Sequence, residues 1–120
     1  MVHSISIKRA YEAPLPTDGY RILVDRLWPR GLSRDHAAID EWMKEIAPSH
    51  ELRRWFAHDP KKWNAFQQRY QAELVTNTCT ALIKAIPEKA KSQDVTLLFA
   101  AKNEEQNNAI VLKHVLCTQR

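Results

Sequence analysis

Four side chains that can do chemistry lie close together in the sequence: Asp25, Arg26, Trp28 and Arg30. Arginine guanidinium groups bind phosphates and carboxylates through paired hydrogen bonds, so Arg26 and Arg30 are candidates to hold an anion. Trp28 would form a wall of the same pocket, and Asp25 is a candidate general acid or base. Because burying an unpaired charge costs several kcal/mol, these residues form either a ligand site or a structural ion pair that involves Asp25.

The second acid–base candidate is His58, because the unperturbed pKa of histidine, about 6.5, lies near neutral pH. The next residue, Asp59, is explained by a helix cap, and a histidine beside a cap is more often structural or exposed. Trp55 and Phe56 could form a stacking surface for a base, although their packing in the core is the favoured explanation.

Further polar residues are expected at the ends of two other strands. Lys8 and Arg9 end the first predicted strand and would add positive charge near Arg26 if the sheet is parallel. The last predicted strand is followed by further candidates for the same site, Lys102, Asn103, Asn107 and Asn108. The free backbone N–H groups of a helix start bind anions, but simple capping by Asn103 explains this segment equally well.

Several other kinds of site are not expected. The five histidines show no metal-ligand spacing, so no metal site is predicted. Cys79 and Cys117 fall on predicted helix faces, where a buried, inert thiol is usual. The two glycines, Gly19 and Gly31, are too few and too far apart for a Walker loop or a dinucleotide-binding fingerprint. We therefore expect no cofactor.

Three segments have the pattern of strands. Residues 4–9 alternate polar and apolar side chains, residues 20–27 have an aliphatic centre, and residues 95–101 form a continuous apolar run. Alternation is typical of a half-buried strand, and a continuous apolar run is typical of a strand covered on both faces. Pro29 and Gly31 follow the second strand and indicate a turn.

Helix signals fill most of the remaining chain. Ser33 and Ser49 are predicted N-caps, the second for a helix that runs to about Phe56. Residues 39–46 show helical spacing, although a short strand would also fit. Asp59 and the proline after it predict the start of another helix.

The last two predicted helices lie in the C-terminal third of the chain. One runs near residues 79–86 and is expected to stop at Pro87. The other is expected from Glu104 to about Cys117, with Asn103 as its cap and acidic residues in its first turn.

This order of elements predicts a single α/β domain over residues 1–120. The expected architecture is a small sandwich in which helices flank a mostly parallel sheet of about three to four strands. Hydrophobic residues are 44% and charged residues 27% of the chain, as in ordinary globular proteins. In such sheets ligands bind at the carboxyl ends of the strands, where Asp25 to Arg30 are expected.

The net charge and the pattern of apolar residues indicate which partners and which compartment to expect. The formal net charge is +4, which mildly favours an anionic partner. No apolar run is long enough for a membrane span, and no signal peptide is visible. With two cysteines and no disulfide framework, the chain is expected to be cytoplasmic, without a membrane partner; its oligomeric state is left open.

Three segments carry a resemblance to a known family: R-I-L-V-D-R-L-W-P-R-G at 21–31, A-P-S followed by L-R-x-W-F-x-H-D-P at 47–60, and V-T-L-L-F-A-A-K-N at 95–103. In this order and spacing the chain resembles the YeaO-like branch of the family named only as domain of unknown function 488. The resemblance implies a small, single-domain bacterial α/β protein with no established activity.

The resemblance also bears on the candidate site. In the broader family, a strand with an aspartate and an arginine at its end and a late strand followed by a helix are expected to form one polar site. Many members carry a Cys-His-Arg signature at the start of that late helix. Residues 103–108 of this chain contain none of these three residue types, so the thiol chemistry suggested elsewhere is not carried over.

These observations lead to one main hypothesis and two alternatives. We expect a cationic pocket that binds a phosphorylated small molecule or nucleotide and could also process it. The first alternative is a nucleic-acid-binding or regulatory module, which the positive charge and four tryptophans favour. The second is a protein-interaction scaffold in which the charged residues form a structural network.

Overall fold

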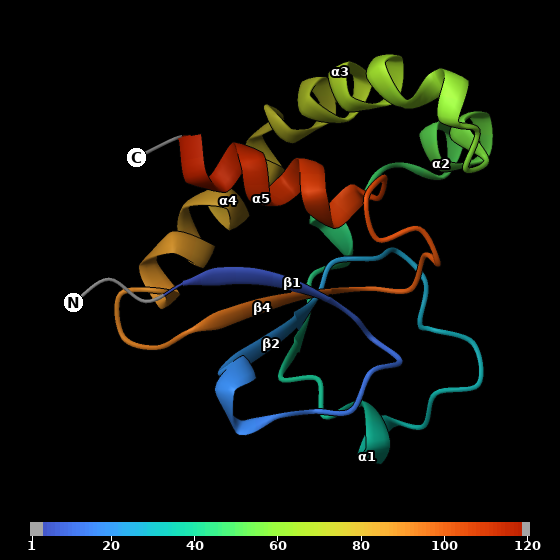
Figure 1. The fold of residues 1–120 in the computed structure, drawn as a ribbon. Helices are drawn as coiled ribbons and strands as arrows, with labels where there is room; N and C mark the ends of the chain where they lie inside the picture. Colours follow the sequence, from blue (N-terminus) through green and yellow to red (C-terminus); the bar gives the residue numbers. More distant parts are fainter. Residues whose placement is uncertain (1–3, 119–120) are drawn as a thin grey trace.

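The centre of the fold is a four-stranded sheet in which all paired strands are parallel (Figure 1). The computed structural model describes residues 4–118, apart from the side chain of Asn77. The strands are β1 (Ile5–Arg9), β2 (Tyr20–Leu23), β3 (Glu41–Trp42) and β4 (Val95–Phe99), and their order in the sheet is β1-β4-β2-β3. The predicted α/β class with a mostly parallel sheet is confirmed.

The three longest helices cover one face of this sheet. The α-helices are α1 (Arg34–Ala37), α2 (His50–Phe56), α3 (Trp63–Leu74), α4 (Asn77–Lys89) and α5 (Asn108–Thr118). Short 3₁₀ turns occupy Pro16–Asp18, Lys44–Ile46 and Pro60–Lys62. Figure 1 shows α3, α4 and α5 on one side of the sheet and α1 on the other.

The predicted caps at three helix starts are confirmed. The side chains of Ser33, Ser49 and Asp59 accept hydrogen bonds from backbone N–H groups in the following turn. These bonds satisfy amides that have no partner within a helix. After Asp59 the chain first forms a 3₁₀ turn and then enters α3.

Two predicted strands are longer than the observed ones. The strand expected over residues 20–27 ends as β2 at Leu23, and the one expected over residues 95–101 ends as β4 at Phe99. After β2, the Val24 N–H still donates to the Leu98 carbonyl of β4. On the β4 side, however, the Ala100 N–H donates to the Asp25 side chain and not to a backbone carbonyl of β2. The ladder stops there because a carboxylate replaces a backbone carbonyl.

Three helix predictions need correction. For residues 39–46 the helix is wrong and the alternative of a short strand is confirmed, because the segment forms β3 and then a 3₁₀ turn, with the Met43 N–H paired to Leu23 of the sheet. The helix expected to stop at Pro87 continues through it to Lys89. Proline removes one hydrogen bond near the helix end, and the fully buried Ile86 holds that turn against the core.

The last helix also begins later than expected. Asn103 accepts from the N–H groups of Glu105 and Gln106 within an irregular turn, and α5 starts only at Asn108. Asn107 takes the capping position, because its side-chain oxygen accepts from the Ile110 N–H. The acidic residues at 104 and 105 therefore precede the helix instead of forming its first turn.

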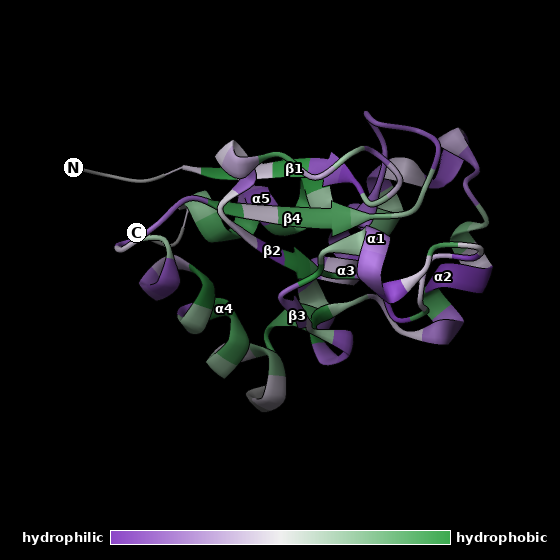
Figure 2. Ribbon diagram, turned by 90° about the horizontal axis from the view of Figure 1, so that it is seen from below, coloured by the Kyte–Doolittle hydropathy of each residue, from purple (hydrophilic) through white to green (hydrophobic). Residues whose placement is uncertain are grey.

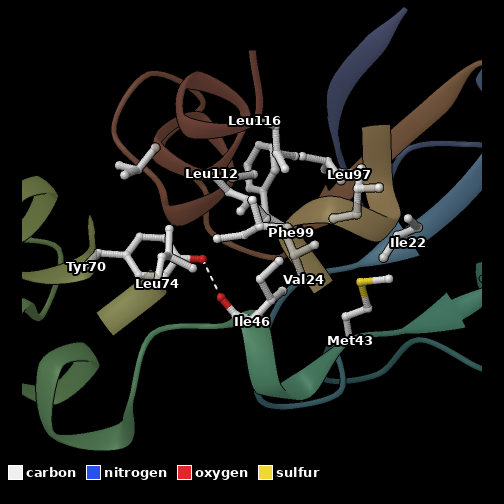
Figure 3. Packing of buried hydrophobic residues seen from close by; sticks show 14 of the residues in the cluster. Ile22, Val24, Met43, Ile46, Tyr70, Leu74, Leu97, Phe99, Leu112 and Leu116 are labelled. Carbon is white, nitrogen blue, oxygen red and sulfur yellow. Dashed lines mark hydrogen bonds between the residues drawn. The ribbon is translucent and has the colours of Figure 1, made fainter. Parts of the chain in front are cut away.

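The main core lies between the sheet and the helices (Figure 3). From the sheet it includes Ile22, Leu97 and Phe99, which pack with buried residues of α3 and α5 such as Tyr70 and Leu112. The Tyr70 hydroxyl is inside this core and donates to the carbonyl of Ile46 at 2.6 Å. In Figure 2, β4 is hydrophobic along most of its length, as expected for a strand buried on both faces.

The other face of the sheet carries a buried ion cluster. Asp18 accepts from Lys8 Nζ at 3.1 Å and from the Arg21 guanidinium, and the Arg21 side chain is 4% exposed. Arg21 also donates to the carbonyls of Ala37 and Ala38, which ties α1 to this face. Burial alone would raise the pKa of Asp18, but hydrogen bonds from Leu15 N–H, Lys8 and Arg21 outweigh it and lower that pKa.

This cluster predicts a large loss of stability in Asp18→Asn, because Arg21 is left buried without an anionic partner. Breaking such a pair typically costs about 3–5 kcal/mol, measurable as the free energy of unfolding in urea. The control is Glu88→Gln, which removes the exposed ion pair with Lys91 and should cost less than about 1 kcal/mol. Equal losses in both variants would contradict a structural role for the cluster.

The comparison of wild type with Asp18→Asn also predicts a pH dependence of the free energy of unfolding. Because the pKa of Asp18 is lower in the folded state, its stabilisation is present above the unfolded value of about 3.9 and is lost as pH falls through the folded pKa. The stability gap between wild type and Asp18→Asn should therefore shrink below about pH 4. Urea titrations at a series of pH values measure this gap.

Candidate functional site

A pocket of about 540 Å³ opens at the carboxyl ends of the strands. It lies between the segment after β2, the segments after β1 and β4, and helices α2 and α3. We call its buried and half-buried lining the floor: Asp25, Arg26, Trp28, Pro29, Pro48, Phe56, Phe66, Ala100, Ala101, Asn107 and Asn108. Its exposed lining is the rim: Tyr11, Leu27, Arg30, Arg53 and His58.

Asp25 is fixed at the floor by bonds from three elements. Its Oδ2 accepts from Ala100 N–H at 2.8 Å, and its Oδ1 accepts from the Asn108 amide at 3.1 Å. Its backbone carbonyl accepts from the Trp42 indole at 2.7 Å. Burial raises the pKa of Asp25, and the bonds from Ala100 and Asn108 and the charges of Arg53 and His58 offset this only in part. In the described residues Asp25 forms no ion pair within 4.0 Å.

Arg26 connects the end of β2 to the segment before α2. Its Nε donates to the Pro48 carbonyl at 3.1 Å and its Nη2 donates to the Ala47 carbonyl at 3.0 Å. These bonds hold one wall of the pocket in place and leave chiefly Nη1 for a ligand. Anion binding by Arg26 together with Arg30 therefore stays a prediction. Arg26 also has a structural role, because it holds the segment before α2.

The rim carries the accessible positive charge. Arg30 is exposed, and its carbonyl accepts from the Tyr11 hydroxyl at 2.7 Å. Arg53 is exposed on α2, with Nη2 3.4 Å from His50 Nδ1. Sequence reasoning did not single out Arg53. The available signal was its position three residues before Phe56 on a predicted helix, which places both side chains on one face.

His58 lines the rim in an unusual backbone conformation. Its φ angle is +58°, and that of Ala57, which ends α2, is +46°. Left-handed backbone is disfavoured for residues other than glycine and is found preferentially at functional sites. Asp59 accepts from the Lys61 N–H, as expected for a cap. The acid–base role of His58 stays a prediction.

Two further candidates shape the pocket from the strand ends. Trp28 lies in the floor, donates through Nε1 to the Leu32 carbonyl at 2.6 Å and contacts Trp42 edge-on at 5.5 Å. Arg9 donates to the carbonyls of Ala100 and Ala101 and lies over the Tyr11 ring. Arg9 thus supports the pocket from outside its lining.

The remaining candidates are distributed differently. Lys8 is outside the lining and binds Asp18 on the second face of the sheet. Lys102 and Asn103 are exposed and also outside it. Asn107 lies in the floor, but its amide donates to the Asn103 carbonyl and its oxygen caps α5. The charge predicted at three strand ends is therefore concentrated after β2 and on α2.

The described part of the chain offers little for metal or thiol chemistry. Residues 4–118 contain no group of three His, Cys, Asp or Glu side chains that could hold a metal ion. Cys79 is buried and lies 3.2 Å from the Glu45 carbonyl, whereas Cys117 is exposed; neither lines the pocket. No helix in the described residues is long and apolar enough to cross a membrane.

The chain was compared with protein families and with known proteins. Residues 4–120 match the family model described as "Inactive DUF488-N3 subclade". The chain belongs to the DUF488 family. It is 47% identical over 109 residues to the uncharacterized protein YeaO of Escherichia coli K12, covering 91% of this chain and 93% of YeaO.

Two mycobacterial proteins are more distant relatives. Over 112 residues the chain is 36% identical to the uncharacterized proteins Mb3100c of Mycobacterium bovis and Rv3073c of Mycobacterium tuberculosis. The match covers 93% of this chain and 92% of each relative. No solved structure gives a significant match. The resemblance to DUF488 and its YeaO-like branch is thus confirmed, and the subclade is one described as inactive.

The backbone of His58 yields a prediction about stability. His58→Gly should stabilise the fold by about 0.5–1 kcal/mol, because relief of left-handed strain of about 1–2 kcal/mol exceeds the added chain entropy of the unfolded state. Thermal unfolding measures the change. Ala38→Gly, at another left-handed residue outside the pocket, is the matched control and should behave alike. A destabilised His58→Gly would show that the imidazole itself supports the fold.

Proposed function

We propose that this protein binds a phosphorylated small molecule of the nucleotide type in the pocket at the carboxyl ends of its strands, without transforming it. The observation that carries the proposal is the charge of the lining. Arg26, Arg30 and Arg53 line the pocket, and Asp25 is the one acidic residue among the described lining residues. A concave site with several guanidinium groups favours phosphate, which accepts bidentate hydrogen bonds.

The apolar part of the lining supports a ligand with a flat ring. Trp28, Phe56 and Phe66 come from three different elements, and the rings of Phe56 and Phe66 stack at 4.3 Å. Aromatic side chains of this kind pack against planar groups. The volume, about 540 Å³, falls within the range of about 300–1,000 Å³ that is usual for small-molecule sites.

The lining favours binding over catalysis. Among the described lining residues there is no cysteine, serine or threonine to act as a nucleophile. Both Asp25 oxygens already accept hydrogen bonds, which hold the carboxylate in place for recognition. The family description, an inactive subclade, is consistent with a retained pocket that lacks a reactive group.

The proposal predicts which arginines matter. Arg30→Ala and Arg53→Ala should each weaken the binding of mononucleotides by about 10–100-fold, since a charged hydrogen bond contributes about 1.5–3 kcal/mol. Isothermal titration calorimetry with AMP, GMP and inorganic phosphate measures the dissociation constants. Arg54→Ala is the matched control, because Arg54 is an exposed arginine of α2 outside the lining.

The proposal fails if wild-type protein binds none of these anions at millimolar concentration. It also fails if Arg54→Ala weakens binding as much as Arg53→Ala, because binding would then reflect general surface charge. A short single-stranded oligonucleotide serves as a further probe. Tighter binding to it than to any mononucleotide, with a steep dependence on salt, would favour the nucleic-acid alternative.

A further inference from the structure

We infer that the pocket selects a guanine nucleotide, with the guanine ring inserted against Asp25 and the phosphate held at the rim. This inference rests on the proposed function and adds the identity of the ring and its orientation. The distribution of charge with depth carries it. The floor holds Asp25, the one acidic side chain of the described lining, and also Arg26, whose Nε and Nη2 are already bound to the Pro48 and Ala47 carbonyls, whereas Arg30 and Arg53 are exposed at the rim.

This polarity fixes which end of a nucleotide enters first. A phosphate at the floor would be repelled by the negative charge of the half-buried Asp25 carboxylate, and of the Arg26 guanidinium chiefly Nη1 is left to bind it. At the rim, the same phosphate meets two exposed guanidinium groups that have room to close around it. The end that enters must therefore carry no negative charge and must donate hydrogen bonds.

The remaining capacity of Asp25 matches two adjacent donors. A carboxylate has about four acceptor positions on its two oxygens, and protein donors from Ala100 and Asn108 occupy one position on each oxygen. Each oxygen thus retains acceptor capacity, and Asp25 lines the pocket. Guanine presents a ring N–H and an exocyclic amine side by side, which can reach both oxygens together. Adenine presents an amine beside an acceptor nitrogen, and hypoxanthine lacks the exocyclic amine.

The neighbours of Asp25 keep this acceptor pair in a fixed orientation. Asn108 donates to both Asp25 and the Val24 carbonyl, and the Trp42 indole holds the Asp25 backbone. The side chain therefore cannot turn toward Arg53 without breaking its bonds to Ala100, just after β4, and to Asn108 of α5. A rigid acceptor pair discriminates between rings because a wrong ring leaves buried polar groups without partners.

The first test compares nucleotides on the wild-type protein by calorimetry. GMP should bind at least about 10-fold more tightly than IMP or AMP, because each of these lacks one of the two adjacent donors. Equal affinities for the three would overturn the ring assignment and leave the proposed phosphate site standing. Failure of all three to bind would overturn the proposed function as well.

The second test is a gain of affinity, which a damaged fold does not produce. In Asp25→Asn, an amide group replaces one of the two acceptors, so the side chain then offers one acceptor and one donor. Xanthine carries a carbonyl in place of the exocyclic amine of guanine and fits that pair. Asp25→Asn should therefore prefer XMP over GMP, whereas the wild type should prefer GMP over XMP.

The matched control is Asp35→Asn, which changes an exposed aspartate outside the pocket and should keep the wild-type order. Unchanged preference for GMP in Asp25→Asn would overturn the inference. If Asp25→Asn does not fold, as judged by circular dichroism and thermal unfolding, the comparison of GMP, IMP and AMP on wild type still decides it.

Discussion

The pocket depends on how the Asp25 carboxylate is held at the end of β2. By accepting from Ala100 N–H and from the Asn108 amide, it connects the exits of β2 and β4 to the start of α5. A carboxylate that accepts hydrogen bonds is stabilised in its charged form, whereas burial opposes that form; here burial dominates and the pKa of Asp25 is raised. The bonds therefore determine the local geometry at an electrostatic penalty.

The two faces of the sheet divide the polar residues between structure and site. One face packs an apolar core under α3, α4 and α5 (Figure 1). The other face takes Lys8 and Arg21 into a buried cluster with Asp18. This cluster holds the loop before β2 and α1 in place. Lys8, which was expected to add positive charge to the pocket, thus stabilises the fold through Asp18.

The family description, an inactive subclade, directs attention to the residues at the start of α5. The start of α5 carries Asn107 and Asn108, whose amides cap the helix and support Asp25. Amide groups in these positions bind neighbouring backbone and carboxylate atoms, which a thiol could do only weakly. Arg30 and Arg53, by contrast, are exposed at the rim.

The sequence by itself determined the fold class and most of the elements, and it pointed to the strand ends at which the pocket opens. Local signals sufficed for these, because helix caps, apolar runs and the strand-end rule depend on residues that are neighbours in the chain. Only the tertiary structure decided which partners the long, flexible lysine and arginine side chains bind. Lys8 and Arg26 each have several partners within reach, and the choice between a ligand and Asp18 or the Pro48 carbonyl depends on segments distant in sequence. The same reason explains why Arg53 was missed: α2 is placed beside the strand ends by its packing against α3 and the core.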